Sequence, residues 1–104
     1  MKTDNICCIY KIVCLDATIN DFYIGATKHA TRRQSQHKYN STSGKESMKL
    51  LYRTIRNNGG WSNWEFKILE QFEFNREMLT VLERKYIREF MPTLNNSFGG
   101  YPSC

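Results

Sequence analysis

The chain lacks long apolar runs and the cysteine patterns of common metal-binding modules. None of its 104 residues belongs to a stretch approaching the roughly 20 apolar residues that cross a bilayer. Its four cysteines, Cys7, Cys8, Cys14 and Cys104, follow neither a CxxC nor a Cys/His spacing, which argues against a zinc site. We interpret them as reduced thiols and expect Cys7 and Cys8 to point to opposite faces of one strand.

The start of the sequence also lacks the features of a signal peptide. The segment MKTDNICC carries Asp4 where such a peptide needs an apolar run. We therefore expect an intracellular protein, cytoplasmic or nuclear, that is not secreted and has no membrane partner. Neither an internal repeat nor a low-complexity segment is evident. A chain of 104 residues suits a single domain, residues 1–104, that carries out the whole function.

An excess of positive charge is the main compositional feature that the chain does have. Fifteen lysine and arginine residues stand against ten acidic residues, which gives a formal net charge of +5 at pH 7. This balance favours an anionic partner. Many basic proteins never bind nucleic acid, so the positions of the charged residues have to decide the question.

Apolar patterning predicts three strands. Residues 6–15 are nearly continuous in apolar character, as in a strand covered on both faces, and a second strand at 22–25 follows the turn-forming residues between them. Within 61–72, Trp64, Phe66 and Ile68 alternate with polar residues, which predicts a third strand. Together with the helices described next, these strands predict an α+β fold in which a three-stranded antiparallel β-sheet is flanked by helices.

Three helices are expected, at about 30–39, within 46–60 and at 75–90. The first is polar and basic, with Thr27 or Thr31 as the candidate cap. The second should end at Gly59, and we interpret it as structural. The apolar positions at helical spacing are Met48, Leu51, Tyr52 and Ile55 in the second helix and Leu79, Leu82, Tyr86 and Phe90 in the third.

One acidic residue occupies a position where an apolar residue is expected. At about 100° per residue, Glu83 falls inside the arc bounded by Leu82, Tyr86, Phe90 and Ile87. A carboxylate facing a core is costly unless a cation or hydrogen-bond donors meet it. Two explanations stay open. One is an ion pair, for example with an arginine of the first helix, and the other is a divalent ion such as Mg²⁺, which often takes only one or two carboxylates.

A basic pair shares one face of the first helix, because Arg33 and His37 are four residues apart. An arginine fork beside an imidazole suits binding a phosphate and moving a proton. A solvated basic surface explains the pair equally well. For Lys28, Arg32 and Lys38, such a surface or simple attraction of phosphate is a sufficient explanation.

Taken in order, these residues resemble the GIY-YIG nuclease domain over nearly the whole chain. The two tyrosines of the paired motifs lie thirteen residues apart, the basic pair follows after a short loop, and the acid and the final asparagine in LERKYIREFMPTLN lie twelve apart. The segments NGGWSNWEF and ERKYI look most like small members of the family from large DNA viruses. The residues that carry the resemblance are Ile9-Tyr10, Tyr23-Ile24-Gly25, Arg33, His37, Glu83 and Asn95.

The resemblance implies a DNA endonuclease that hydrolyses phosphodiester bonds with one divalent cation, Mg²⁺ or Mn²⁺. Glu83 would be the metal ligand and Arg33 the phosphate clamp, while Tyr10 and Tyr23 would be paired hydroxyls at the scissile phosphate. It also agrees with the predicted sheet flanked by helices. The residues expected to bind DNA are Lys28, Arg32, Arg33 and Lys38.

The remaining two site residues have supporting roles in this scheme. Asn95 would hold the site together by hydrogen bonding, and His37 would contact Tyr10 or the phosphate. A tyrosine of unperturbed pKa about 10 is a poor base at neutral pH, so cations or onward transfer of its proton must help it. We expect Tyr10 to act as general base or relay, although the reverse assignment with Tyr23 stays open.

One position departs from the family pattern, because Cys8 stands where the first motif has glycine. A strand accepts cysteine, so the fold should not change unless this position needs the backbone freedom of glycine. The alternative function is a catalytically impaired DNA-binding module of the same fold. Retention of all six site residues argues against it. Both a monomer and a DNA-dependent dimer stay open.

Overall fold

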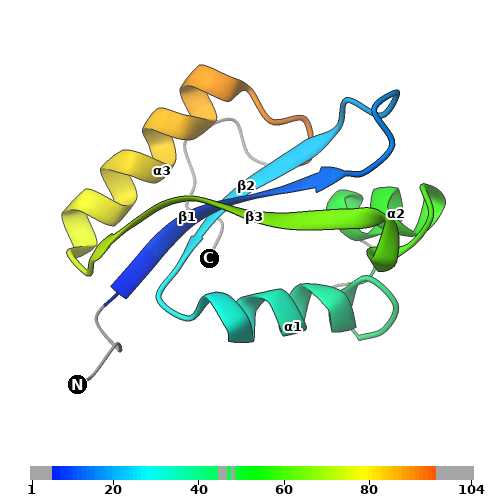
Figure 1. Cartoon of the computed structure of the whole chain (residues 1–104), viewed down its shortest axis with the longest axis horizontal. Coiled ribbons are helices and arrows are strands. Elements are labelled where there is room, and N and C mark those ends of the chain that lie inside the picture. Colours follow the sequence, from blue (N-terminus) through cyan, green and yellow to red (C-terminus); the bar gives the residue numbers. More distant parts are fainter. Residues whose placement is uncertain (1–5, 45–46, 48, 96–104) are drawn as a thin grey trace.

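A three-stranded antiparallel sheet in the order β2-β1-β3 forms the centre of the molecule (Figure 1). This computed structural model describes residues 6–44, 47 and 49–95. The predicted sheet is confirmed, and the strands are β1 (Ile6–Cys14), β2 (Phe22–Thr27) and β3 (Trp64–Glu73). β1 lies in the middle of the sheet, and its side chains pack in buried clusters on both faces. Its nearly continuous apolar sequence predicts such cover.

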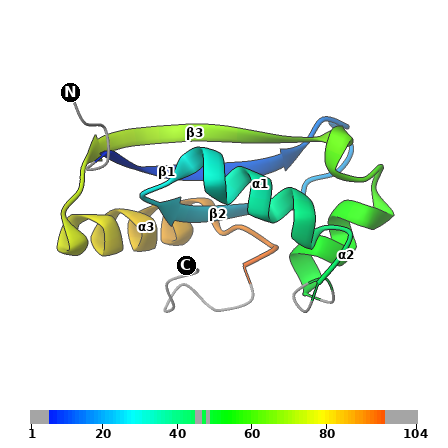
Figure 2. The same ribbon diagram turned by 90° about the horizontal axis from the view of Figure 1, so that it is seen from below.

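Helices cover both faces of this sheet, with α3 on one side and α1 and α2 on the other (Figures 1 and 2). The helices are α1 (Ala30–Asn40), α2 (Leu50–Asn57) and α3 (Arg76–Phe90), and a short 3₁₀ helix, η2 (Trp61–Asn63), precedes β3. The expected α+β architecture is therefore confirmed. In the part of the chain that the structure describes, each helix is too short or too polar to cross a membrane.

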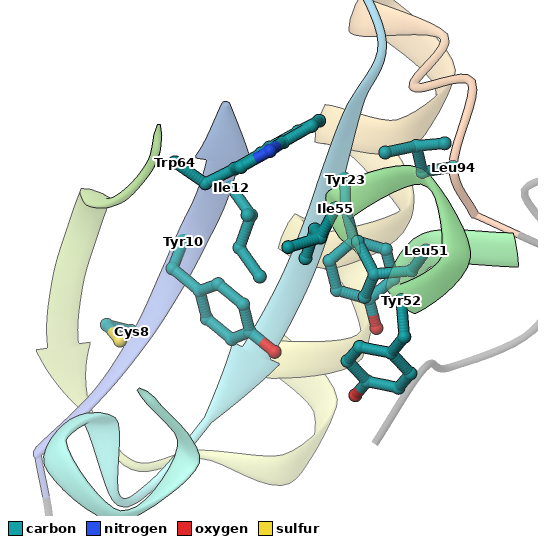
Figure 3. Packing of buried hydrophobic residues seen from close by; sticks show 9 residues of the cluster. All are labelled: Cys8, Tyr10, Ile12, Tyr23, Leu51, Tyr52, Ile55, Trp64 and Leu94. Atoms are coloured by element: carbon teal, nitrogen blue, oxygen red, sulfur yellow. The ribbon is translucent and has the colours of Figure 1, made fainter. Parts of the chain in front are cut away.

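Alternation along β1 divides the core into two clusters. Cys8, Tyr10 and Ile12 face α2 and pack in the cluster that Figure 3 shows, whereas Ile9 packs on the opposite face in a cluster with Ile87 of α3. Successive strand side chains alternate between faces, so Cys7 and Cys8 point in opposite directions as expected.

The described cysteines carry no disulfide. Cys7, Cys8 and Cys14 are free thiols, in line with their interpretation as reduced, and Cys104 lies outside the described residues. The Cys7 thiol donates to the carbonyl oxygen of Phe72 at 3.5 Å. These thiols therefore act as small apolar side chains in and near the core.

A β-bulge in β3 changes the predicted alternation of that strand. Ile9 pairs with Glu70 and Tyr10 pairs with Ile68, which leaves Leu69 as an extra residue. A bulge bends the strand and re-aims its side chains. Ile68 lies before the bulge and pairs with Tyr10 as Phe66 pairs with Ile12, so it shares a face with Trp64 and Phe66 as predicted, and the bulge interrupts the alternation only after it. Ile68 is nevertheless 46% exposed, while Leu69 packs against the cluster on the other face.

The starts of two helices test the capping predictions. His29 occupies the cap position of α1 without a side-chain hydrogen bond, so the prediction of a threonine cap is wrong. The Thr27 hydroxyl instead accepts a hydrogen bond from the backbone N–H of His29 at 3.0 Å, because the chain is still turning out of β2 there. At α3 the Asn75 side chain accepts from the Met78 N–H at 3.0 Å, which satisfies one of the free donors of the helix start.

Glycine ends α2 as predicted. Gly59 and Gly60 have φ angles of 96° and 77°, in the left-handed region that glycine adopts without steric cost. The Gly60 N–H donates to the Ile55 carbonyl at 2.9 Å and closes the last turn. Met48, expected on the buried face of this helix, lies outside the described residues.

The buried face of α3 is centred on Glu83 and Ile87 rather than on the predicted apolar stripe. Both residues are buried, whereas Phe90 at the end of that stripe is exposed. In the last turn of the helix, the Lys11 ammonium of β1 lies 5.6 Å from the Phe90 ring centroid. The predicted position of Glu83 on a buried face is confirmed.

Replacing Gly25 by alanine should destabilise the fold, because Gly25 pairs with Tyr10 across the ladder. A Cβ at this position would lie 2.4 Å from the Tyr10 hydroxyl oxygen, and such overpacking costs about 1–3 kcal/mol. Urea unfolding measures the difference. The wild type is the reference, because Gly25 is not among the glycines with a positive φ angle and alanine therefore adds a steric contact without backbone strain. A Gly25→Ala protein as stable as the wild type would contradict the close contact.

Candidate active site

A buried histidine joins two tyrosine hydroxyls on the face of the sheet that carries α1 and α2. The Tyr10 hydroxyl lies 2.8 Å from His37 Nε2, and the Tyr52 hydroxyl lies 2.8 Å from His37 Nδ1. Tyr10 comes from the central strand, His37 from α1 and Tyr52 from α2. Three elements that are separate in the sequence therefore meet at one imidazole.

The imidazole of His37 is neutral at physiological pH. Burial, together with the smaller effect of the positive charges of Arg33 and Lys49, lowers its pKa to about 4. A neutral imidazole has one N–H donor and one acceptor nitrogen. The imidazole therefore donates a hydrogen bond to one of the two tyrosine hydroxyls and accepts a hydrogen bond from the other.

Aromatic rings enclose the two motif tyrosines. The ring centroids of Tyr10 and Tyr23 are 6.3 Å apart, and His37 lies 5.8 Å from Tyr23. Phe66 stacks on Tyr10 with centroids 4.4 Å apart, and Figure 3 shows Tyr10 and Tyr23 on neighbouring strands with Tyr52 beside them. Tyr10 is 0% exposed and Tyr23 is 7% exposed, so both motif tyrosines are buried.

The two charged residues of the predicted site come from opposite sides of the sheet. Arg33 lies on α1, one turn before His37, whereas Glu83 lies on α3 and is 3% exposed. β2 is the edge strand between these helices (Figure 2). The helices that carry the two charged residues therefore cover different faces of the sheet (Figures 1 and 2).

The acidic groups fit a metal that takes few protein ligands. Among the described residues no group of three or more His, Cys, Asp or Glu side chains gathers, which does not suit a fully protein-held ion such as structural zinc. Mg²⁺ or Mn²⁺ held by Glu83 would keep open positions for water and phosphate oxygens. Glu83 is the residue that would hold it.

Asn95 lies along the outer edge of β2. Its Oδ1 accepts from the Ile24 N–H at 3.0 Å, and its Nδ2 donates to the Ile24 carbonyl at 2.8 Å. Leu94 N–H donates to the Phe22 carbonyl at 3.0 Å, and Thr93 Oγ1 accepts from the Phe22 N–H at 3.3 Å. The segment after α3 thus pairs with groups that an edge strand would otherwise leave exposed.

The basic residues expected to bind DNA divide into two groups. Lys28 and Arg32 line a groove of about 550 Å³ that also contains Gln71 of β3, and none of the tyrosines, His37 or Glu83 lines it. The Lys28 ammonium lies 4.3 Å from the Phe74 ring centroid. Lys38 is exposed on α1. Of the four predicted DNA-binding residues, Arg33 is the one that approaches His37.

Cys8 occupies an ordinary strand position. It pairs with Thr27 on one side and Gln71 on the other, and among the described non-glycine residues Met91 alone has a positive φ angle. Burial raises the pKa of its thiol to about 11, so it is a neutral apolar group. Glycine is not required here by the backbone of this chain.

Tyr52 is the residue at this site that sequence reasoning missed. Its spacing with Leu51 and Ile55 indicated a packing role, and its ring is indeed buried with them. The hydroxyl contact to His37 has no local sequence signal, because fifteen residues and a change of helix separate the two side chains. Only the packing of α2 beside α1 reveals it.

Lowering the pH should destabilise the fold through His37. In the unfolded chain a histidine has a pKa of about 6.5, whereas burial lowers the pKa of His37 to about 4 in the folded chain. Stability present above pH 6.5 is therefore lost as the pH falls toward 4, by up to about 3 kcal/mol. Urea unfolding over this pH range measures the slope. His37→Gln should flatten it and exposed His29→Gln should not; equal slopes in the wild type and His37→Gln would refute the assignment.

Removing the Asn95 amide should loosen the edge of β2 locally. Asn95→Ala loses both hydrogen bonds to Ile24, at about 1–2 kcal/mol in total, and should speed amide exchange of Ile24. Thr93→Val is the matched control, because it removes the acceptor of the Phe22 N–H on the same edge. Native-state hydrogen exchange by NMR distinguishes the two. Unchanged Ile24 protection in Asn95→Ala is the result that this account does not allow.

Known proteins resemble this chain in both sequence and fold. The model of the GIY-YIG catalytic domain family matches residues 6–96. One similar solved structure is a mutant catalytic domain of the intron endonuclease I-TevI, with a TM-score of 0.68, 24% identity and coverage of 95% of this chain and 94% of that chain. Another is the catalytic domain of the homing endonuclease I-TevI, with a TM-score of 0.66, 25% identity and coverage of 94% and 98%.

No curated protein matches the chain, so its closer resemblance to members from large DNA viruses stays a prediction. The family match extends from β1, which carries the first tyrosine motif, to the segment that pairs with the edge of β2. It therefore includes every residue that the sequence assigned to the site. The chain belongs to the GIY-YIG nuclease family.

Proposed function

We propose that this chain is a divalent-metal-dependent endonuclease that hydrolyses phosphodiester bonds of DNA. The observation that carries the proposal is the hydrogen bond between the Tyr10 hydroxyl and the neutral, buried imidazole of His37, beside the positive charge of Arg33. A phenol held against an imidazole and a guanidinium suits proton transfer next to a phosphate. Membership in the GIY-YIG family supports a nuclease. We further propose that this chain is active, that it uses a divalent metal ion and that its tyrosines assist the attack of water.

Hydrolysis needs a proton acceptor for the attacking water and positive charge on the phosphate. We assign the first task to Tyr10 as general base, with Tyr23 as the second hydroxyl at the scissile phosphate. Arg33 supplies a fork of N–H donors for a nonbridging phosphate oxygen, where negative charge grows in the transition state. His37 holds the Tyr10 oxygen in place, and Asn95 holds the edge of β2.

Glu83 is the proposed ligand for Mg²⁺ or Mn²⁺. When bound, one such ion supplies Lewis-acid stabilisation of charge on the phosphate and its leaving oxygen. A buried carboxylate is suited to this task, because little water competes with the phosphate for the remaining positions. A structural ion pair is the competing explanation for Glu83, and it predicts loss of stability rather than loss of metal-dependent cleavage on substitution.

DNA is the proposed partner, and the protein is proposed to act inside the cell. Four basic residues are proposed to contact DNA phosphates. Arg33 would do so at the active site, and the others would do so outside it: Lys28, Arg32 and Lys38. Contacts to the DNA backbone position a protein without reading sequence, so weak sequence preference is the expectation for the chain by itself. Their attraction to phosphate also makes binding weaken as salt rises.

Cleavage of supercoiled plasmid tests this function directly. The wild type should nick the plasmid with Mg²⁺ or Mn²⁺ and not with EDTA, and Glu83→Gln should slow nicking by about 100-fold or more, since it removes the charged ligand but keeps the shape. Glu89→Gln is the matched control, because Glu89 is exposed on the same helix and should leave the rate unchanged.

Two results would overturn the proposal. One is the absence of metal-dependent nicking by the folded wild type, and the other is a rate that Glu83→Gln does not change. If the protein binds the plasmid without cutting it, the chain is instead a DNA-binding module that has lost catalysis. Thermal melting of both variants separates loss of catalysis from loss of the fold.

A further inference from the structure

The two edges of the sheet differ in what covers them. On β2, the segment after α3 pairs with the backbone of Phe22 and Ile24. β3 is the other edge strand, because its neighbour in the order β2-β1-β3 is β1 alone (Figure 2). In the part of the chain that the structure describes, no second segment pairs with the outer side of this ten-residue strand. An edge of this length is a template for a strand of another chain.

The bulge at Leu69 places Lys67 and Glu70 on the same face of β3. Lys67 pairs with Lys11 of β1, and Glu70 pairs with Ile9. Ile9 and Lys11 are two residues apart on β1 and both point toward α3, so the residues opposite them point the same way. Without the extra residue, two positions three apart in a strand would lie on opposite faces.

A second copy of β3 matches this edge when it runs antiparallel to the first. If Lys67 lies opposite Glu70 of the second copy, the two-fold symmetry also sets Glu70 opposite Lys67 of that copy, and two ion pairs form. In the same register Phe66 lies opposite Gln71. Phe66 and Gln71 pair with Ile12 and Cys8 of β1, so they share the face that carries α1 and α2.

Charge selects this register over its neighbours. Moving the second copy by two residues in one direction sets Glu70 opposite Glu65, and like charges directly opposite each other are unfavourable. Moving it by two residues in the other direction sets Lys67 opposite Phe72. Of these three registers, the one with Lys67 opposite Glu70 alone pairs opposite charges and keeps side chains of one face together.

Two features of the isolated strand would be relieved by this pairing. Lys67 is exposed and lies directly across from Lys11, another cation, so a carboxylate on its outer side would offset an unfavourable contact. Ile68 is 46% exposed in the middle of β3 and would lie beside the two-fold axis. The two bulges would meet at that axis, so both strands would interrupt the ladder at the same place.

We propose that β3 pairs with β3 of a second copy of this chain, antiparallel and with Lys67 opposite Glu70, so that the two sheets join into one. The two-fold axis of such a pair is perpendicular to the sheet. Both copies therefore present α1, and with it the contact between His37 and Tyr10, on the same side. Two sites on one side suit the two strands of a single duplex. That consequence rests on the proposed function, whereas the pairing itself does not.

Sedimentation equilibrium of the full chain, without DNA or metal, tests the pairing. The wild type should form dimers as its concentration rises. Lys67→Glu should raise the dimer Kd by about tenfold or more, because it turns two attractive contacts into two repulsive ones. Lys85→Glu is the control of equal charge change, since Lys85 is exposed on α3, and it should leave the Kd unchanged.

Reversing both charges tests the register. Glu70→Lys alone should weaken the dimer as Lys67→Glu does, whereas the double variant Lys67→Glu/Glu70→Lys should return the Kd to within about threefold of the wild type. An equimolar mixture of the two single variants should also dimerise, because opposite charges then face each other again. A folded double variant that stays as weak as the single variants would overturn the proposed register.

A second measurement covers the case in which Glu70→Lys does not fold, since the Tyr86 hydroxyl donates to Glu70 Oε1 at 2.8 Å. Lys67→Glu removes the repulsion from Lys11 within one chain, so it should not lower the melting temperature. Hydrogen exchange by NMR should show that outward-facing amides of β3 become more protected as the wild-type concentration rises, and that Lys67→Glu abolishes this effect.

Two results would overturn the pairing. One is a wild type that stays monomeric at the millimolar concentrations used for NMR, which would leave the edge of β3 open or available to a different chain. The other is a dimer that Lys67→Glu does not weaken, which would place the interface elsewhere. A monomeric chain that nicks plasmid with Mg²⁺ would leave the proposed function standing, and a dimer that nicks none would leave the pairing standing.

Discussion

A neutral imidazole buried between two tyrosine hydroxyls is the interaction around which this molecule is arranged. For His37 to reach Tyr10, α1 must lie flat against the face of the sheet on which β1 displays that tyrosine. For Tyr52 to reach the other nitrogen, α2 must pack beside α1. Both hydrogen bonds lie in an interior of low dielectric, where a satisfied pair is strengthened and an unsatisfied one is costly. The polar network therefore specifies the position of two helices on an otherwise apolar surface.

The edge of the sheet is the second constraint. Arg33 and His37 lie on α1 and Glu83 on α3, and these helices cover opposite faces of a sheet in which β2 is an edge strand (Figure 2). An open edge invites pairing with another chain. The segment that follows α3 covers it, with the Asn95 amide bonded to the backbone of Ile24 in both directions. A residue that resembles a catalytic asparagine thus has a clear structural task, which is to keep the edge in place.

Much of the architecture follows from patterns within single elements. The continuous apolar run of β1, the spacing along α3 and the glycines after α2 indicate strand, helix and helix end because each depends on neighbours a few residues away. The anomaly at Glu83 was visible for the same reason, since helical periodicity alone places it on the buried face. The exposure of Ile68 and Phe90 was not visible, because it depends on which distant elements pack over each side chain.

The sequence by itself determined the order of the elements, the family resemblance, and the candidate residues Tyr10, Tyr23, Arg33, His37, Glu83 and Asn95. Tertiary structure alone decided how they are connected. It brought the Tyr10 hydroxyl to one nitrogen of His37 and that of Tyr52 to the other, and it separated Lys28 and Arg32 into a different groove. The physical reason is that periodicity reports which face of an element is buried, whereas the partner of a buried polar group depends on how distant elements pack against each other.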